Sequence, residues 1–136
     1  MLIKLGTKRL GELVIEFCSR KGLGKPPAEV NLYSREEYVE ETGNDKTAAR
    51  YSAAKDQIAT SPDIVSNISL ILHELAHHCQ ALREGSAEFD RKYDEYTKTY
   101  GYINNPYEVE ARELEKEWWP EFEQLLKKKL EATGIG

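Results

Sequence analysis

A helical pattern in the middle of the chain places the strongest constraint on its fold. Residues 63–83 carry apolar side chains at three- and four-residue intervals, at Ile64, Ile68, Leu72, Leu75, Cys79 and Leu82. This spacing predicts one helix with a broad apolar face that packs against a core. Ser61, Pro62 and Asp63 supply signals for its start, and Gly85 supplies the signal for its end.

Shorter patterns predict the other elements. Before the central helix we expect a helix over residues 7–21, a short strand over 29–34, an acidic helix over 35–42, and a hairpin or pair of short strands over 49–61. After it we expect a helix from Ser86 to Gly101 and a last helix that opens at Asn105-Pro106 and that Pro120 kinks or splits. Together these elements predict an α+β fold, with a small sheet and about four helices in one domain.

The composition is typical of a single folded domain, here residues 1–136. Of its residues, 40% are hydrophobic and 32% are charged, a balance that does not fit a disordered tail. The formal net charge of −5 argues against nucleic acid as the main partner. The two cysteines, Cys18 and Cys79, lie in apolar helical patterns, where we expect buried free thiols and no disulfide framework.

The apolar runs of the chain give an expectation about its location. The N-terminal stretch mixes Lys4, Lys8 and Arg9 with apolar residues, unlike the long apolar core of a signal peptide. No apolar run approaches the length that would span a membrane. We therefore expect a cytoplasmic protein that does not insert into membranes.

The central helix contains the sequence His73-Glu74-Leu75-Ala76-His77, which is the H-E-x-x-H pattern. Residues four apart lie one above the other on a helix, so both imidazoles can reach one metal ion. Glu74 is turned about a quarter-circle away from His73, where its carboxylate can reach a metal-bound water as general base. The pattern predicts a zinc site with Glu74 as its catalytic residue. The alternative is that the histidines merely fill one face of the helix.

A catalytic zinc site usually has a third protein ligand. Of the three histidines, His78 is turned about 100° away from His77, where we expect it at the surface. The third ligand should therefore be a carboxylate, and Glu108 and Glu110 in the first turns of the last helix are the candidates. Glu108 has an alternative role, because Asn105-x-x-Glu108 is close to a capping box in which the glutamate reaches back to its helix start.

With these residues the sequence resembles the gluzincin metallopeptidases, which pair H-E-x-x-H on one helix with a glutamate ligand on a later one. The resemblance covers residues 49–119 and is strongest to the minimal soluble gluzincins, which are related to catalytic domains of membrane metallopeptidases. It implies a minimal zincin-like domain, a Zn²⁺ cofactor, and Glu108 as the third ligand, three residues before Ala111. The related membrane enzymes carry an aspartate just after that alanine, where this chain has Arg112. The resemblance therefore does not explain which carboxylate holds the metal ligands in place by hydrogen bonds in this chain.

The resemblance also implies features around the site. Gluzincins place an edge strand that pairs with extended substrate just ahead of the active-site helix, at the strand-like residues 57–60; the alternative is an ordinary edge strand. An oxyanion stabiliser is also needed, and four tyrosines are near enough in sequence to supply it: Tyr93, Tyr96, Tyr100 and Tyr102. For each tyrosine taken singly, a packing role is favoured, so none is assigned.

The C-terminal segment has two interpretations. Minimal gluzincins can be held inactive by their own C-terminal residues, so the segment after Pro120, through Leu125 and Leu126 to Gly136, could cover the cleft. The alternative is that this amphipathic segment simply completes the core.

These patterns together predict a zinc endopeptidase of gluzincin type that acts on a peptide or an unfolded protein. A homodimer is compatible with the sequence. The alternative function is a zincin-like regulatory or interaction protein that binds the metal with little turnover.

Overall fold

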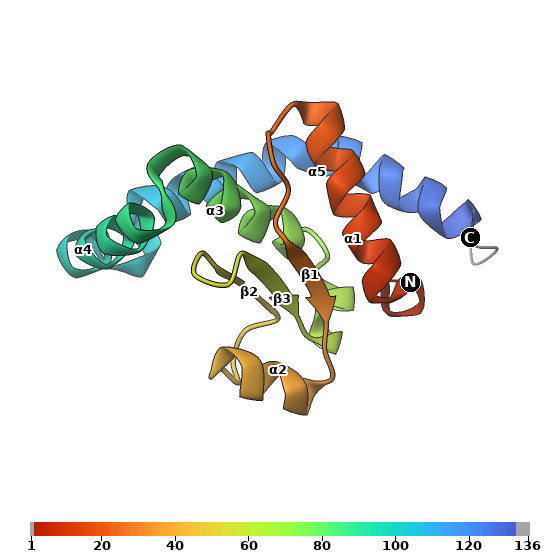
Figure 1. Cartoon of the computed structure of the whole chain (residues 1–136), viewed down its shortest axis with the longest axis horizontal. Coiled ribbons are helices and arrows are strands. Elements are labelled where there is room, and N and C mark those ends of the chain that lie inside the picture. The colour runs from red at the N-terminus through yellow and green to blue at the C-terminus, as the bar shows by residue number, and fades with distance from the viewer. Residues whose placement is uncertain (1, 133–136) are drawn as a thin grey trace.

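A three-stranded sheet lies between one small helix and a layer of longer helices (Figure 1). The computed structural model describes the backbone of residues 2–132 and the side chains of residues 8–131. Within these residues the elements are α1 (Leu2–Lys21), β1 (Glu29–Leu32), α2 (Arg35–Thr42), β2 (Ala49–Ser52), β3 (Gln57–Thr60), η1 (Pro62–Ser66), α3 (Leu70–Glu84), α4 (Ser86–Asn104) and α5 (Pro106–Ala132). The predicted α+β class is confirmed, with five α-helices in the described residues.

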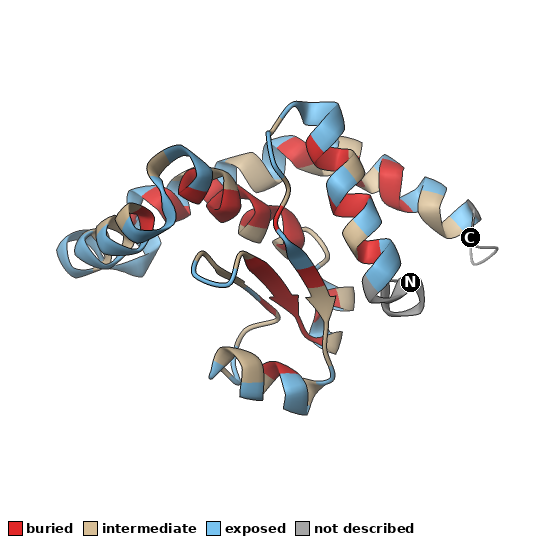
Figure 2. Ribbon diagram, in the orientation of Figure 1, coloured by how far each residue is buried: buried red, intermediate tan, exposed pale blue. Residues whose placement is uncertain are grey.

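The core forms where α1, α3 and α5 pack together against the sheet. Its fully buried members come from all of these elements and include Leu13, Phe17, Ile58, Leu72, Leu75 and Phe122. The rings of Trp118 and Phe122 meet Phe17 edge-on, at centroid distances of 5.8 and 5.5 Å. Figure 2 shows the buried residues on the inward sides of these helices. Burial of each large apolar side chain stabilises the fold by about 1.5–3 kcal/mol.

The strand Gln57–Thr60 is the centre of the sheet. β3 pairs in parallel with β1 and antiparallel with β2, and all four of its residues are buried. A strand covered on both sides need not alternate apolar and polar residues, so its position cannot be read from its pattern. The prediction of an edge strand over residues 57–60 is therefore wrong. β1 and β2 are the two edge strands, and β2 lies beside α3.

The predicted central helix is divided in two. A 3-10 helix covers Pro62–Ser66, Asn67 leaves the helical conformation at φ −154°, and α3 begins only at Leu70. The hydroxyl of Ser69 donates a hydrogen bond of 2.6 Å to Oε2 of Glu115 and lies 3.1 Å from Oδ1 of Asn67. Ser69 thus ties the start of α3 to the preceding turn and to α5. The H-E-x-x-H pattern lies wholly within α3, so its geometry is unaffected.

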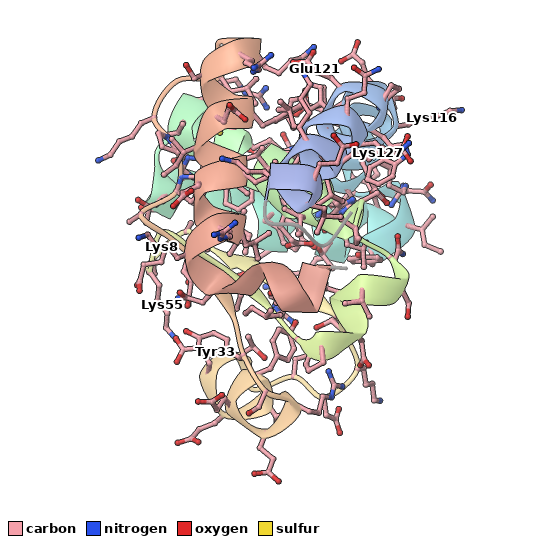
Figure 3. All side chains as sticks on the ribbon, turned by 90° about the vertical axis from the view of Figure 1, so that its right-hand side faces the viewer. Lys8, Tyr33, Lys55, Lys116, Glu121 and Lys127 are labelled. Atoms are coloured by element: carbon pink, nitrogen blue, oxygen red, sulfur yellow. The ribbon has the colours of Figure 1, made fainter. Side chains whose placement is uncertain are left out.

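The last helix runs through Pro120 without a break. Proline removes the N–H that would bind the carbonyl four residues earlier, which belongs to Lys116. Lys116 is exposed and extends away from the body of the molecule (Figure 3), so water can reach this part of the helix. Trp118 and Phe122 are both buried in the core and hold the helix on either side of the proline. The predicted split at Pro120 is therefore absent, and the predicted alternative of a kink there stays a prediction.

Candidate metal centre

The two histidines of the H-E-x-x-H pattern lie on the buried side of α3. His73 is 7% exposed and His77 is 6% exposed, and their ring centroids are 4.9 Å apart. This is the arrangement that the i, i+4 spacing predicts. Both Nε2 atoms face the first turns of α5 across the interface between the two helices.

Glu108 meets both imidazoles from α5. Its Oε1 lies 2.7 Å from Nε2 of His73, and its Oε2 lies 3.3 Å from Nε2 of His77. One ligand atom from each of the three residues lies within 4.8 Å of the others, and all three side chains are buried. Two imidazole nitrogens and a carboxylate oxygen are the donor set of a catalytic zinc site. The group could therefore hold a metal ion.

The start of α5 explains why Glu108 is free to face the histidines. Asn105 is fully buried, and its Oδ1 accepts a hydrogen bond of 2.9 Å from the N–H of Tyr107. The N–H of Asn105 donates instead to the carbonyl of Tyr102, so Glu108 does not close a capping box. Glu110, the other candidate ligand, binds Gln80 and Arg83, which follow His77 along α3. Of the two glutamates, only Glu108 reaches the histidines.

The outward nitrogen of each imidazole also has a partner. Nδ1 of His73 lies 3.2 Å from Oε1 of Glu115, and Nδ1 of His77 lies 2.8 Å from Oε1 of Gln80. The amide nitrogen of Gln80 donates to Glu110 and to the carbonyl of Tyr107, so its oxygen must be the atom that faces His77. Because both partners accept, each Nδ1 carries a proton, and Nε2 is the nitrogen that can bind a metal once its own proton is displaced.

Sequence reasoning did not identify Gln80 or Glu115. Glu115 lies seven residues after Glu108, which places both on one face of α5, and Gln80 lies three residues after His77 on α3. These spacings are the signals that could have found them. Glu115 supplies a carboxylate that contacts Nδ1 of the candidate ligand His73. Arg112, which has no carboxylate, cannot support a ligand in this way. The exposed guanidinium of Arg112 instead donates to the carbonyl of Ile103.

The close contacts in this group shift its pKa values when no ion is bound. Burial lowers the pKa of His73, but hydrogen bonds to Glu108 and Glu115 outweigh it and raise the pKa to about 10. Burial also lowers the pKa of His77, but its contact with Glu108 and the nearby carboxylate charges outweigh burial and raise the pKa. Burial raises the pKa of Glu108, yet hydrogen bonds from both imidazoles outweigh it and hold the pKa well below its usual range. A metal ion that binds here must therefore displace protons from the imidazoles.

A cleft of about 670 Å³ opens over this group. Its floor contains Glu74 beside the three candidate ligands. Its walls come from the segment before and along β2 and from α4, namely Asn44, Thr47, Arg50, Tyr51, Phe89, Asp90, Tyr93, Asp94 and Tyr102. Burial raises the pKa of Glu74, while His77 and His73 lower it by their charge. Glu74 is therefore a carboxylate at the cleft floor that neighbours the histidines without joining their group.

The C-terminal segment does not reach this cleft within the described residues. Leu125 and Leu126 are buried in the core, and no residue of 120–131 lines the cleft. The interpretation of residues 120–131 as a cover is therefore wrong, and they complete the core instead. The part of that prediction that concerns residues 133–136 lies outside the described residues.

His78 is buried and not at the surface. It is 2% exposed, its Nε2 donates to the carbonyl of Lys25 at 2.7 Å, and its Nδ1 lies 3.4 Å from the hydroxyl of Tyr51. The prediction of a surface histidine is wrong because the chain that leads into β1 covers this side of α3. A single helical pattern does not reveal how many sides of the helix are covered. His78 ties α3 to that connection and to β2.

Comparisons with known protein families, with curated proteins and with solved structures find no significant match to this chain. In the described part of the chain, no helix is long and apolar enough to cross a membrane. The likeness to gluzincins thus remains a resemblance carried by a few residues. The structure adds to it a buried group of His73, His77 and Glu108 that could bind a metal.

Proposed function

We propose that this chain is a zinc-dependent endopeptidase of gluzincin type. His73, His77 and Glu108 hold the ion, and Glu74 is the general base. The observation that carries the proposal is the convergence of the three ligand atoms within 4.8 Å, from two separate helices, at the floor of a cleft. A helix whose histidines merely fill one face would not bring a buried carboxylate from another helix to both Nε2 atoms.

The donor set favours zinc among the common metal ions. Imidazole nitrogens with one carboxylate suit Zn²⁺, whereas Mg²⁺ and Ca²⁺ prefer sites made of oxygen alone. Zinc with three protein ligands keeps a position open, where it lowers the pKa of water to about 7 and polarises a substrate carbonyl. The three side chains supply this set, and Glu115 and Gln80 hold the two imidazoles in the required tautomer.

Glu74 has the position and the environment of a general base. It lies on the cleft floor, between the histidines in sequence but outside their group. Burial raises its pKa, which increases its affinity for the proton of an attacking water at neutral pH. The same carboxyl can then give that proton to the leaving amine, so that one residue serves both steps.

The wall formed by β2 suits an extended peptide. β2 is an edge strand of the sheet, and its residues Arg50 and Tyr51 line the cleft. The outer edge of such a strand can bind the main chain of an extended peptide by hydrogen bonds, with little dependence on sequence. A peptide or an unfolded protein is therefore the proposed substrate class.

The experiment that tests this function compares wild type with Glu74→Gln on an unfolded protein and a peptide library. We expect the variant to keep its zinc and to lose hydrolysis, because it removes the base but no ligand. Glu84→Gln is the matched control, since Glu84 lies on the same helix, binds Lys92 and does not line the cleft. Zinc-loaded wild type without turnover would instead support the metal-binding regulatory protein.

A further inference from the structure

Tyr93 of α4 contacts the metal-binding group directly. Its hydroxyl donates a hydrogen bond to Oε2 of Glu108, while Oε1 of the same carboxylate lies 2.7 Å from Nε2 of His73. The ring of Tyr93 stands 6.0 Å from the ring of His77 and 6.0 Å from that of Phe89. Oε2 of Glu108 thus contacts both the phenol and Nε2 of His77, and the phenol is the partner that comes from outside the helix pair α3 and α5.

Asn105 fixes the position of Tyr93 relative to Glu108. Its amide nitrogen donates to the carbonyl of Tyr93 at 3.2 Å and to the hydroxyl of Thr97 at 3.0 Å. Its oxygen accepts from the N–H of Tyr107 in the first turn of α5. One fully buried side chain therefore ties the main chain at Tyr93 to the helix turn that carries Glu108. The side chain of Asn105 therefore helps to fix the position of the Tyr93 phenol relative to the Glu108 carboxylate.

The other tyrosines of this region lack such a contact. Tyr102 lines the cleft but is 58% exposed. Tyr96 packs against the rings of Tyr100 and Tyr107. Among the described tyrosines, only Tyr93 is hydrogen-bonded to one of the three candidate ligands.

We infer that Tyr93 is a positioning residue that holds the carboxylate of Glu108 in the orientation required for metal binding. This inference rests on the proposed metal site and adds a residue to it. The hydroxyl anchors Oε2, which also lies 3.3 Å from Nε2 of His77, while Oε1 lies 2.7 Å from Nε2 of His73, so the anchored carboxylate faces both imidazoles. Glu108 is only 3% exposed, so water cannot easily replace the lost donor if the hydroxyl is removed. The carboxylate would then turn, and the ion would lose a fixed ligand.

The test is Tyr93→Phe, with Tyr96→Phe as the matched control on the same helix. Phenylalanine keeps the ring contacts with His77 and Phe89 and removes only the hydroxyl. We expect zinc affinity, measured by competition with a chromophoric chelator, to fall about 10- to 100-fold for Tyr93→Phe. The visible absorption of the Co²⁺-substituted protein should also change, because it reports the coordination of the ion. Tyr96→Phe should alter neither quantity.

A double-mutant cycle separates positioning from packing. In a Glu108→Gln background, Tyr93→Phe should have much less effect on zinc affinity, because the carboxylate that it orients is gone. Tyr93→Met provides a second variant without the hydroxyl in case the first folds poorly, and it should lose affinity to the same extent.

Unchanged zinc affinity and an unchanged Co²⁺ spectrum in Tyr93→Phe would overturn the inference, even if hydrolysis fell, because that pattern belongs to a residue that contacts substrate. Such a result would leave the proposed function intact. Wild type that binds no zinc would remove the proposed function itself, so the two failures are distinguishable.

Discussion

Nδ1 of His73 lies 3.2 Å from Oε1 of Glu115, which stands on the same face of α5 as Glu108. Glu115 also accepts a hydrogen bond of 2.6 Å from the hydroxyl of Ser69, so its carboxylate is held from two sides. A carboxylate behind a histidine ligand fixes the ring and makes its other nitrogen a stronger donor to a metal. The gluzincin resemblance leads us to expect a supporting carboxylate at position 112, where this chain has Arg112. The carboxylate behind His73 is instead that of Glu115, one turn farther along α5.

Substitution of Glu115 should weaken metal binding without removing a ligand. We predict that Glu115→Gln lowers zinc affinity by about 10-fold or more, because an amide can keep the hydrogen bond but not the charge. Chelator competition measures this affinity. Glu113→Gln on the same helix is exposed and should have no effect. Equal affinities for the two variants would show that Glu115 does not support the site.

The two glutamates at the start of α5 should behave differently. Glu108→Gln removes a proposed ligand, so its zinc affinity should fall by more than the roughly 10- to 100-fold loss typical of an outer partner. Glu110→Gln should change affinity little, because Glu110 binds Gln80 and Arg83 and not the histidines. Isothermal titration with zinc checks both. A larger loss in Glu110→Gln than in Glu108→Gln would contradict this choice of ligand.

The Tm of the metal-free protein should fall with rising pH, whereas the increase in Tm that zinc causes should grow. The pKa of His73 is raised to about 10, so the stability that its protonation contributes is complete below about pH 6.5 and is lost as the pH rises towards 10. In EDTA, this contribution should lower the Tm over that range. The increase in Tm on addition of zinc should grow over the same range, because fewer protons compete with the ion. A zinc-dependent increase that does not vary with pH would contradict this prediction.

The C-terminal part of α5 should be required for folding. Phe122 is fully buried against Phe17, so Phe122→Ala should reduce the free energy of unfolding by about 3–5 kcal/mol. Urea denaturation followed by circular dichroism measures the change. Lys128→Ala, at an exposed position of the same segment, should stay within about 0.5 kcal/mol of wild type. A chain that ends at Trp119 should unfold; one that stays folded with increased hydrolysis would restore the idea of a cover.

Periodicity predicts most of the helical elements, although not the division of the central helix, and it places the two histidines of the site. The i, i+4 spacing of His73 and His77 places both side chains on one helix face whatever surrounds the helix, and the structure has them there. The α2 helix was also predictable, because Ser34 and Glu37 form a capping box at its start. Such local signals depend on residues that are neighbours in sequence.

Features that depend on packing between distant segments were not predictable. His78 looked exposed because the chain at Lys25, which covers it, is far away in sequence. Ser69, at the start of α3, has its partner Glu115 on another helix. The position of β3 in the middle of the sheet depends on its parallel pairing with β1. A single sequence does not encode these contacts in any short pattern.

Metal analysis of untagged protein tests most directly the claim that His73, His77 and Glu108 form a zinc site. After loading with zinc and dialysis, wild type should retain about one zinc ion per chain, as a site with three protein ligands requires. His73→Ala and His77→Ala should retain little, while remaining folded by circular dichroism. No zinc in wild type after loading, or one zinc per chain in both histidine variants, would contradict the claim.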